Sequence, residues 1–458
     1  MHQYDAATEA LTEAIVGYSV DRIRLDPPPL DGSRSYDELY AAVGETITPT
    51  GIGGLRALEL FRDVLAPATI STDHTKFLSF VPAAPTEASI LFDLVVGASS
   101  IFGGSWLEGA GAVFVENQAL RWIANLAGLP ESAGGVFVSG GTNGNLSALI
   151  AARFNWRLRS EGRHDRVRGL MLASSGSHSS IAAAARAMDA DIVKVAADDR
   201  GRMDAAALQA TVDQLQPEDR ERVFVVVATA GTTNAGVIDD LDGAGRIAAE
   251  LGVWFHVDGA YGAAALCSPT ARPKFVGIER CDSLIVDPHK WLFAPFDSCA
   301  LVYRNPEIGR AAHTQHAEYL DVLHAEDAPL HEMNPSDYAH HLSRRARGLP
   351  FWYSLATYGT DSYADAVDAT LAVTQAAADL IRRAAHLELL IDPELSIVLF
   401  RRIGWTPAEY QSWSDRQLRA GESFVVPTAW RGETVLRFCF VHPRTTAEQV
   451  GEILDSLV

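Results

Sequence analysis

The sequence contains few cysteines: Cys267, Cys281, Cys299 and Cys439 are the only four among 458 residues. No two of them form a Cys-x-x-Cys pair, and none stands at a Cys/His spacing typical of a metal site. Scattered cysteines of this kind are common in the reducing cytosol, where most are small buried apolar side chains. We therefore expect a cytoplasmic protein without a metal centre.

The sequence also lacks long apolar runs and an excess of positive charge. No run reaches the ~20 apolar residues that a membrane-spanning helix requires. Residues 1–5 show neither the basic region nor the apolar region of a signal peptide. The 38 Lys and Arg residues are outnumbered by 58 Asp and Glu residues, which gives a net charge of −20. Because phosphate-rich partners need clustered positive charge, we do not expect nucleic acids or anionic membranes as partners.

Hydrophobic residues, in contrast, make up 48% of the chain, enough for a large core. Between residues 135 and 301, short apolar segments alternate with helix-like segments, which indicates βαβ units and a mostly parallel sheet. Residues 223–227 are apolar throughout, as expected for a strand covered on both faces. Residues 384–458 alternate strand and helix again, which is typical of a small α+β unit.

Three segments carry glycines or charged side chains directly after apolar strands. Residues 139–145 form a Gly-rich turn that leads into a helix, and the free N–H groups and dipole at such a start attract anions. Asp258 and Lys290 each follow an apolar run. Ligands of open α/β sheets bind at the carboxyl ends of strands, where these segments would meet. The Gly-rich turn suits the phosphate of pyridoxal phosphate, Asp258 suits its pyridinium nitrogen, and Lys290 suits its aldehyde carbon.

Five motifs follow one another along the chain. They are Ser139-Gly140-Gly141-Thr142, Ser177-His178-Ser179-Ser180, Thr229-Ala230-Gly231-Thr232-Thr233, His256-Val257-Asp258-Gly259-Ala260-Tyr261 and Pro288-His289-Lys290-Trp291. With them the chain, from about His74 to the C-terminus, resembles the group II pyridoxal-phosphate-dependent amino-acid decarboxylases, which include aromatic-L-amino-acid, histidine and glutamate decarboxylases. The last two motifs together are highly specific. The resemblance implies decarboxylation of an L-amino acid to the amine and CO2.

The resemblance also implies a fold and an assembly. The fold would be α/β and aspartate-aminotransferase-like, that is fold type I, with a mostly parallel sheet in the large domain. Residues 1–74 would form a helical segment that packs on the partner subunit. Residues 75–347 would form the large cofactor-binding domain, and residues 348–458 the small C-terminal α+β domain. We expect a homodimer with its active site at the subunit interface.

Individual roles follow from the same resemblance. Lys290 would hold pyridoxal 5'-phosphate as a Schiff base until the substrate amine displaces it, and Asp258 would keep the pyridine nitrogen protonated. His178 would stack on the cofactor ring and take part in proton transfer. Further contacts with the cofactor are expected from Gly141, Thr142, Asn143, Thr232, Ala260 and His289.

The substrate class is less sharply defined by the sequence. The aromatic residues Phe80 and Phe102, with neighbours of the same kind, predict a pocket for an aromatic or otherwise apolar side chain. Lys76 could equally receive an acidic side chain. Arg437 is a candidate ligand of the substrate carboxylate, with a structural ion pair as the alternative.

One catalytic role has two candidate positions. Decarboxylases of the resembling family protonate the substrate α-carbon with a Tyr on a mobile loop. An ungapped alignment on Arg344 places Pro335 there, and a three-residue deletion places Tyr338 there. Family members without this hydroxyl yield aldehydes, so oxidative decarboxylation–deamination is an alternative. A carbon–carbon lyase similar to sphingosine phosphate lyases and a non-catalytic cofactor-binding scaffold are further alternatives, and the catalytic Lys, Asp and His together argue against the scaffold.

Overall fold

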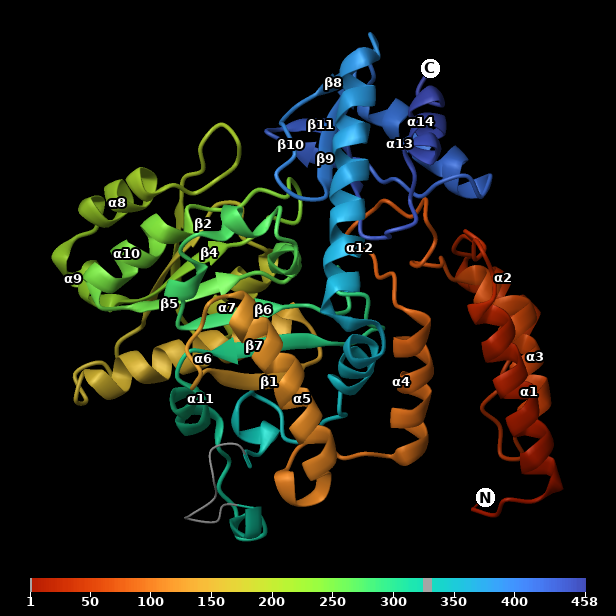
Figure 1. Ribbon diagram of the computed structural model, residues 1–458, viewed down its shortest axis with the longest axis horizontal. Coiled ribbons are helices and arrows are strands. Elements are labelled where there is room, and N and C mark those ends of the chain that lie inside the picture. The colour runs from red at the N-terminus through yellow and green to blue at the C-terminus, as the bar shows by residue number, and fades with distance from the viewer. Residues whose placement is uncertain (1, 324–331) are drawn as a thin grey trace.

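The computed structural model describes residues 2–323 and 332–458, which form two sheets surrounded by helices (Figure 1). The larger sheet has seven strands in the order β1-β7-β6-β5-β4-β2-β3. Its strands are β1 (Gly134–Val138), β2 (Leu170–Ser174), β3 (Asp191–Val195), β4 (Val223–Thr229), β5 (Trp254–Asp258), β6 (Ser283–Val286) and β7 (Cys299–Tyr303). Only β7 is antiparallel to its neighbours, β1 and β6. The predicted mostly parallel sheet is confirmed.

Helices cover both faces of this sheet, because its strands are apolar on both sides. Along β2, Leu170 and Leu172 join the core on one face, whereas Met171 and Ala173 join the core on the other. The helices of the first face are α5 (Trp106–Leu126), α8 (Ala205–Gln214) and α10 (Leu241–Leu251). Those of the second face are α6 (Gly141–Arg159), α7 (Ser179–Ala187) and α11 (Pro306–His313). Two-sided burial explains the uninterrupted apolar run of β4.

The C-terminal part of the chain builds the smaller sheet, which is antiparallel and ordered β10-β11-β9-β8. Its strands are β8 (Leu387–Leu389), β9 (Ile397–Arg402), β10 (Thr428–Trp430) and β11 (Glu433–Cys439). The helices packed on it are α12 (Leu349–Arg383), α13 (Pro407–Arg419) and α14 (Ala447–Asp455). Figure 1 shows α12 running from the large sheet to the small one. The predicted small α+β unit is confirmed.

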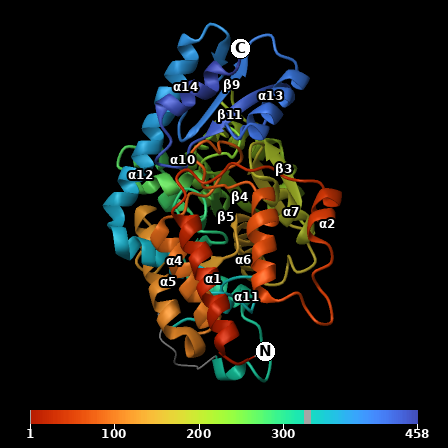
Figure 2. The same ribbon diagram turned by 90° about the vertical axis from the view of Figure 1, so that its right-hand side faces the viewer.

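The N-terminal helices lie at one edge of the molecule, apart from the large sheet (Figures 1 and 2). Neither α1 (Ala6–Ile23) nor α2 (Tyr36–Val43) contains a buried residue, and α3 (Gly54–Leu60) buries only Leu60. Apolar side chains of this region therefore remain exposed, as Phe61 is at 46%. The division of the chain at residues 74 and 347 stays a prediction. Over residues 2–323 and 332–458, no helix has the length and apolar character needed to span a membrane.

A buried carboxylate joins α5 to the start of α12. Glu116 is 4% exposed and accepts a hydrogen bond of 2.6 Å from the backbone N–H of Gly348. Burial raises the pKa of Glu116 from 4.5 to about 7, and this hydrogen bond and the charges of Arg344 and Arg347 oppose the shift. The folded protein therefore keeps a proton that the unfolded chain releases within this pH window. The free energy of unfolding consequently falls as the pH rises from about 4.5 to about 7.

In the variant Glu116→Gln, the free energy of unfolding is expected to rise relative to that of the wild type as the pH rises. The expected gain is about 3 kcal/mol between the unfolded-state and folded-state pKa values of Glu116. Glutamine keeps an acceptor for the Gly348 N–H but has no proton to lose. Urea unfolding at about pH 5 and about pH 8 measures the change. Glu250→Gln, at an exposed position of α10, is the control. A difference between the Glu116 variant and the wild type that does not depend on pH would show that folded Glu116 is ionised throughout.

Candidate active site

A cavity of about 550 Å³ lies at the carboxyl-terminal edge of the large sheet. The segments that follow β1, β4, β5 and β6 contribute to it, as does the turn before α7. Its lining residues are Ser139, Gly140, Gly141, Thr142, Asn143, Asn145, Leu146, His178, Thr229, Gly231, Thr233, Asp258, Ala260, Tyr261, Asp287, His289, Lys290 and Phe296. The three strand-end segments singled out in the sequence thus meet in one place, since parallel strands end at the same edge of a sheet.

Lys290 stands beside a buried carboxylate. Its Nζ lies 2.8 Å from Oδ2 of Asp287, and the Asp287 side chain is 1% exposed. Burial alone would lower the pKa of Lys290, but the charge and hydrogen bond of Asp287 raise it above its ordinary value. Burial alone would raise the pKa of Asp287, but Lys290 and His289 lower it. The two side chains therefore form an ion pair within the cavity.

Asp258, the last residue of β5, presents a second buried carboxylate, which is 4% exposed. Its Oδ2 accepts a hydrogen bond of 2.9 Å from Nδ2 of Asn145, and its Oδ1 accepts one of 3.2 Å from the backbone N–H of Ala260. Both carboxylate oxygens thus accept hydrogen bonds from donors of the protein.

The start of α6 forms an anion cradle. Gly140 is the N-cap of this 19-residue helix and supplies no side-chain cap, so the first N–H groups of the helix have no intrahelical partner. A Cβ on Gly141 would lie 3.1 Å from Oδ2 of Asp287 and 3.2 Å from the Cβ of Ala260. A larger residue at this position would therefore push Asp287 or Ala260 aside by a few tenths of an ångström, and glycine allows the close approach.

His178 is the N-cap of α7 and its side chain is accessible from the cavity. Its Nδ1 accepts a hydrogen bond of 3.2 Å from the backbone N–H of Ser180 and lies 2.9 Å from the Ser180 hydroxyl. His289 is 8% exposed, with Nδ1 2.6 Å from the carbonyl oxygen of Ser298 and its ring 4.9 Å from that of Phe296. Burial lowers the pKa of His289, although Asp287 opposes this effect.

Several residues named from the sequence do not line the cavity of this chain. Arg437 donates from Nη1 to the carbonyl oxygen of Phe80 (2.7 Å) and from Nη2 to that of Thr233 (2.8 Å). Phe80 itself is 61% exposed. Thr232 is 5% exposed, and its hydroxyl accepts a hydrogen bond of 3.2 Å from the Val237 N–H.

Phe102 and Tyr338 also lie outside the cavity. Phe102 pairs with Arg345 in an isolated β-bridge. Tyr338 is 1% exposed and belongs to the core on the α6 face of the sheet. Its hydroxyl donates a hydrogen bond of 2.8 Å to Sδ of Met333.

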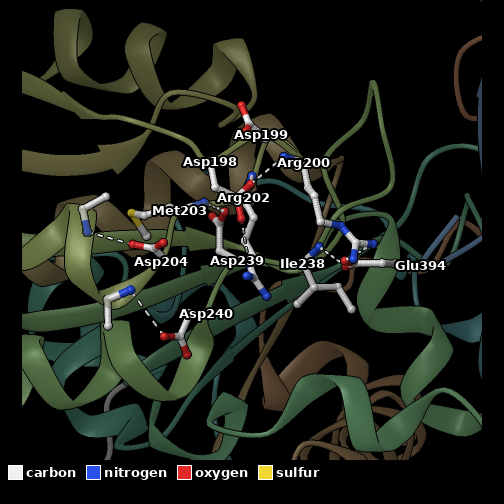
Figure 3. Close-up of polar contacts among 12 residues, drawn as sticks. Asp198, Asp199, Arg200, Arg202, Met203, Asp204, Ile238, Asp239, Asp240 and Glu394 are labelled. Carbon is white, nitrogen blue, oxygen red and sulfur yellow. Dashed lines mark hydrogen bonds and ion pairs between the residues drawn. The ribbon is translucent and has the colours of Figure 1, made fainter. Parts of the chain in front are cut away.

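Asp239 lies in a cluster of residues joined by polar contacts, which includes Met203 and Asp204 (Figure 3). It is 2% exposed, and its two oxygens accept hydrogen bonds from the backbone N–H groups of Met203 (2.7 Å) and Thr229 (2.8 Å). Burial raises the pKa of Asp239 to about 7, and these hydrogen bonds oppose the shift. Because Thr229 lines the cavity, Asp239 ties one wall of the site to the segment before α8.

Sequence reasoning missed the roles of Asp287 and Asn145. A usable signal for Asp287 was a charge at the end of an apolar strand, three residues before Lys290. A usable signal for Asn145 was its spacing of four residues from Gly141, which places both on the same face of a helix. Asp239, in contrast, lies within Ile238-Asp239-Asp240, where the sequence does not distinguish it from its acidic neighbour.

Comparison with known proteins identifies the family. Residues 55–403 match the pyridoxal-dependent decarboxylase conserved domain. The aromatic-L-amino-acid decarboxylase of Bacillus atrophaeus is 29% identical over 443 residues, covering 94% of this chain and 90% of that protein. The L-2,4-diaminobutyrate decarboxylase of Rhizobium meliloti is 32% identical over 418 residues, covering 89% and 82%. The solved structure of Oryza sativa TDC with PLP and tryptamine has a TM-score of 0.90 at 22% identity, covering 100% of this chain and 99% of that one, and thereby supports the fold.

The cofactor of this family fits the cavity. The uncapped start of α6 suits a phosphate group, the Asp258 carboxylate suits a protonated ring nitrogen, and the Lys290 amine suits an aldehyde carbon. The cofactor is therefore pyridoxal 5'-phosphate. The domain match favours a decarboxylase over the carbon–carbon lyase and over the non-catalytic scaffold. The chain belongs to the pyridoxal-dependent decarboxylase family, and it is a carboxy-lyase that uses pyridoxal phosphate.

Proposed function

We propose that this protein decarboxylates an L-amino acid with an aromatic or otherwise apolar side chain, releasing the amine and CO2. The observation that supports this proposal is that each of the two carboxylates in the cavity already has a partner. Asp258 and Asp287 are the only acidic residues among those that line it, and Asn145 and Lys290 engage them. A second ammonium group on a substrate would find no free carboxylate among these lining residues. The ring of Phe296, a residue that is 54% exposed, offers an apolar contact instead.

Five residues of the cavity have proposed roles toward the cofactor. The bound cofactor supplies a ring that accepts the electron pair left when CO2 departs. Lys290 would hold the cofactor through Nζ, and Asp258 would keep the ring nitrogen protonated. The backbone N–H of Gly141 and the hydroxyl of Thr142 would bind the phosphate. His178 would contact the ring and supply a proton in the cavity.

The remaining residues predicted from the sequence are Ala260, His289, Thr232 and Arg437, and the roles proposed here for the last two differ from that prediction. Ala260 would leave room for the cofactor ring, and His289 would contact the phosphate. Thr232 acts through the hydrogen bond that its hydroxyl accepts from the Val237 N–H, which holds the loop that carries Gly231 and Thr233, rather than through direct contact. Arg437, with both of its terminal nitrogens bonded to carbonyl oxygens, shapes the substrate entrance by holding Phe80 and Thr233.

We also propose a homodimer in which residues 1–74 pack on the partner subunit. The absence of buried residues in α1 and α2 supports this arrangement. Phe80 and Phe102 would then complete a substrate pocket at the subunit interface. Sedimentation velocity is expected to show a dimer, and deletion of residues 1–74 is expected to weaken both the dimer and turnover. A fully active monomer would contradict the proposal.

We further propose that the protein is cytoplasmic. Its four cysteines are unpaired and buried, the state favoured in a reducing compartment. Cell fractionation is expected to recover the protein with cytosolic markers. Recovery with a membrane or secreted fraction would contradict this location.

A specific observation favours aldehyde formation as the second candidate reaction. The hydroxyl of Tyr338, proposed from the sequence as the proton donor to the α-carbon, is bonded to Met333 in the core. The phenylacetaldehyde synthase of a Rosa hybrid cultivar is 26% identical over 355 residues, covering 75% of this chain and 69% of that protein. In this second reaction an amino acid, oxygen and water would give the aldehyde, CO2, ammonia and hydrogen peroxide.

The test offers L-amino acids to the purified protein loaded with cofactor and follows CO2, oxygen and product mass together. CO2 with an equal amount of amine and no oxygen uptake is expected from an aromatic substrate. Oxygen uptake equal to CO2, with aldehyde, would establish the second reaction instead. Tyr338→Phe is the matched control, and a loss of amine product in this variant would show that the buried hydroxyl reaches the substrate during turnover.

A further inference from the structure

A buried amide links two of the residues that face the cofactor. Asn145 on α6 is 1% exposed. Its Nδ2 donates to Oδ2 of Asp258 and to the hydroxyl of Ser180, each at 2.9 Å. Its Oδ1 lies 2.8 Å from Nε2 of His256. Both N–H groups and the carbonyl oxygen of one side chain are therefore used to hold neighbouring polar groups.

The directions of these hydrogen bonds have one consistent assignment. The Asp258 carboxylate oxygens act as acceptors, so the Asn145 amide nitrogen faces Asp258 and its oxygen faces His256. His256 therefore carries its proton on Nε2. The indole N–H of Trp254 can only donate, so the Ser283 hydroxyl oxygen accepts its hydrogen bond (2.8 Å). The Ser283 hydroxyl then donates its own hydrogen to Nδ1 of His256 (2.8 Å). His256 is fully buried, and burial lowers its pKa to about 4, although Asp258 opposes the shift. The ring is therefore neutral, which agrees with these hydrogen-bond directions.

The second branch from Asn145 reaches His178. The Ser180 hydroxyl accepts from Asn145, so its own hydrogen is free to donate to Nδ1 of His178 at 2.9 Å. The backbone N–H of Ser180 also donates to Nδ1, at 3.2 Å. Because Nδ1 accepts two hydrogen bonds, it carries no proton in the neutral ring. The proton of His178 lies on Nε2, for which the described residues provide no hydrogen-bond partner.

We propose that Asn145 is a positioning residue that couples Asp258 to His178 by holding Asp258 as an acceptor and His178 as the Nε2–H tautomer. The proposal deepens the function proposed above, on which it rests for the roles of Asp258 and His178. One amide thus orients both the charge beneath the ring nitrogen and the proton that His178 presents to the cavity. A change in the hydrogen bonding of Asp258 is transmitted through Asn145 and Ser180 to the imidazole.

Asn145→Asp is the most direct variant, since it changes shape little and reverses the hydrogen-bond directions. The new carboxylate cannot donate to Asp258 or to Ser180, and it takes the hydrogen of the Ser180 hydroxyl away from His178. Ser180→Ala cuts only the branch to His178 and leaves the bond to Asp258. Asn155→Asp is the matched control, since Asn155 lies on the same helix outside this network.

The first readout is the ring tautomer of His178 in the protein without cofactor, measured by nitrogen NMR of histidine-labelled protein with His178→Gln for assignment. The wild type and Asn155→Asp are expected to show the Nε2–H tautomer. Asn145→Asp and Ser180→Ala are expected to shift the ring toward a tautomer mixture. An Nδ1–H ring in the wild type, or no tautomer change in either variant, would overturn the proposal. Ser180→Ala alone keeps the test decisive if Asn145→Asp does not fold.

The second readout is the pH dependence of cofactor affinity and of kcat. Asn145→Asp is expected to weaken cofactor binding and lower kcat by about 10- to 100-fold, with a displaced pH profile. Ser180→Ala is expected to lower kcat while leaving cofactor affinity within about threefold of the wild type, because hydrogen bonds to Asp258 remain. Equal effects on cofactor affinity in both variants would overturn the two-branch arrangement. If the wild type binds cofactor but releases no CO2, the proposed function fails while the tautomer result still decides the role of Asn145.

Discussion

Lys290→Ala is expected to abolish turnover, lowering kcat at least about a thousandfold, and to remove the visible absorption of the bound cofactor. Lys290 carries the only primary amine among the residues that line the cavity. No other lining side chain can therefore replace its covalent bond to the cofactor. Absorption spectra after gel filtration and single-turnover assays measure the two effects. A protein-bound visible band with normal turnover would contradict the assignment.

The same substitution is expected to destabilise the protein without cofactor. Removing Lys290 leaves the buried Asp287 carboxylate without its partner at 2.8 Å, which costs about 3 kcal/mol near neutral pH. In the wild type, Lys290 and His289 hold the pKa of Asp287 below 3.8 against the opposing effect of burial. The contribution of the ion pair is therefore present above this value and is lost as the pH falls through the lower folded-state pKa. The stability difference between the two proteins should shrink in acid.

Lys290→Arg separates the covalent role from the electrostatic role. The guanidinium keeps a positive charge beside Asp287 but forms no Schiff base with an aldehyde. We expect urea unfolding to show recovery of stability, while turnover stays as low as in the alanine variant. A variant with arginine that is as unstable as the alanine variant would show that shape, rather than charge, decides the fit of Lys290.

Asp258→Asn is expected to lower kcat by about 10²- to 10⁴-fold while the cofactor remains bound. A neutral amide cannot hold a proton on the ring nitrogen, so the ring withdraws electrons less strongly from the reacting carbon. The fold should be kept, since asparagine can still turn its oxygen toward Nδ2 of Asn145. Steady-state kinetics with an L-amino acid that the proposed decarboxylation test identifies as a substrate, together with cofactor titration, measure the effect.

Two comparisons make the Asp258 prediction specific. A cofactor analogue whose ring nitrogen carries a permanent positive charge is expected to restore part of the lost turnover. Asp282→Asn is the matched control, because Asp282 lies at the opposite end of the same strands and bonds to the backbone N–H of Phe255 (2.8 Å). This control is expected to leave kcat unchanged. Failure of the charged analogue to help would mean that Asp258 acts mainly by position.

The fold class could be predicted because its determinants are local. The apolar run of β4 and the alternation of strands with helices appear in the sequence itself. The meeting of Gly141, Asp258 and Lys290 follows from one further rule, that parallel strands end at a common edge. No contact between distant residues had to be known in advance.

Other features depend on partners far away in the chain. Arg437 could not be assigned from the sequence, because its acceptors are the carbonyl oxygens of Phe80 and Thr233, which any residue type supplies. Tyr338 belongs to a core that also contains residues of β1 and α6, which are more than 170 residues away in the sequence. The network around Asn145 depends on two strands and two helices that come together only in the folded protein.

The single reversed strand has a consequence for the synthesis of the protein. β1 pairs only with β7, so that Gly134 lies opposite Tyr303. On the ribosome, the Gly-rich turn after β1 emerges long before the strand that anchors it, and non-local pairings of this kind form late. The sheet can be completed only after β7 has left the exit tunnel. A chain interrupted before residue 299 would carry an unpaired apolar strand beside an unfinished cavity, which makes such a product prone to aggregation.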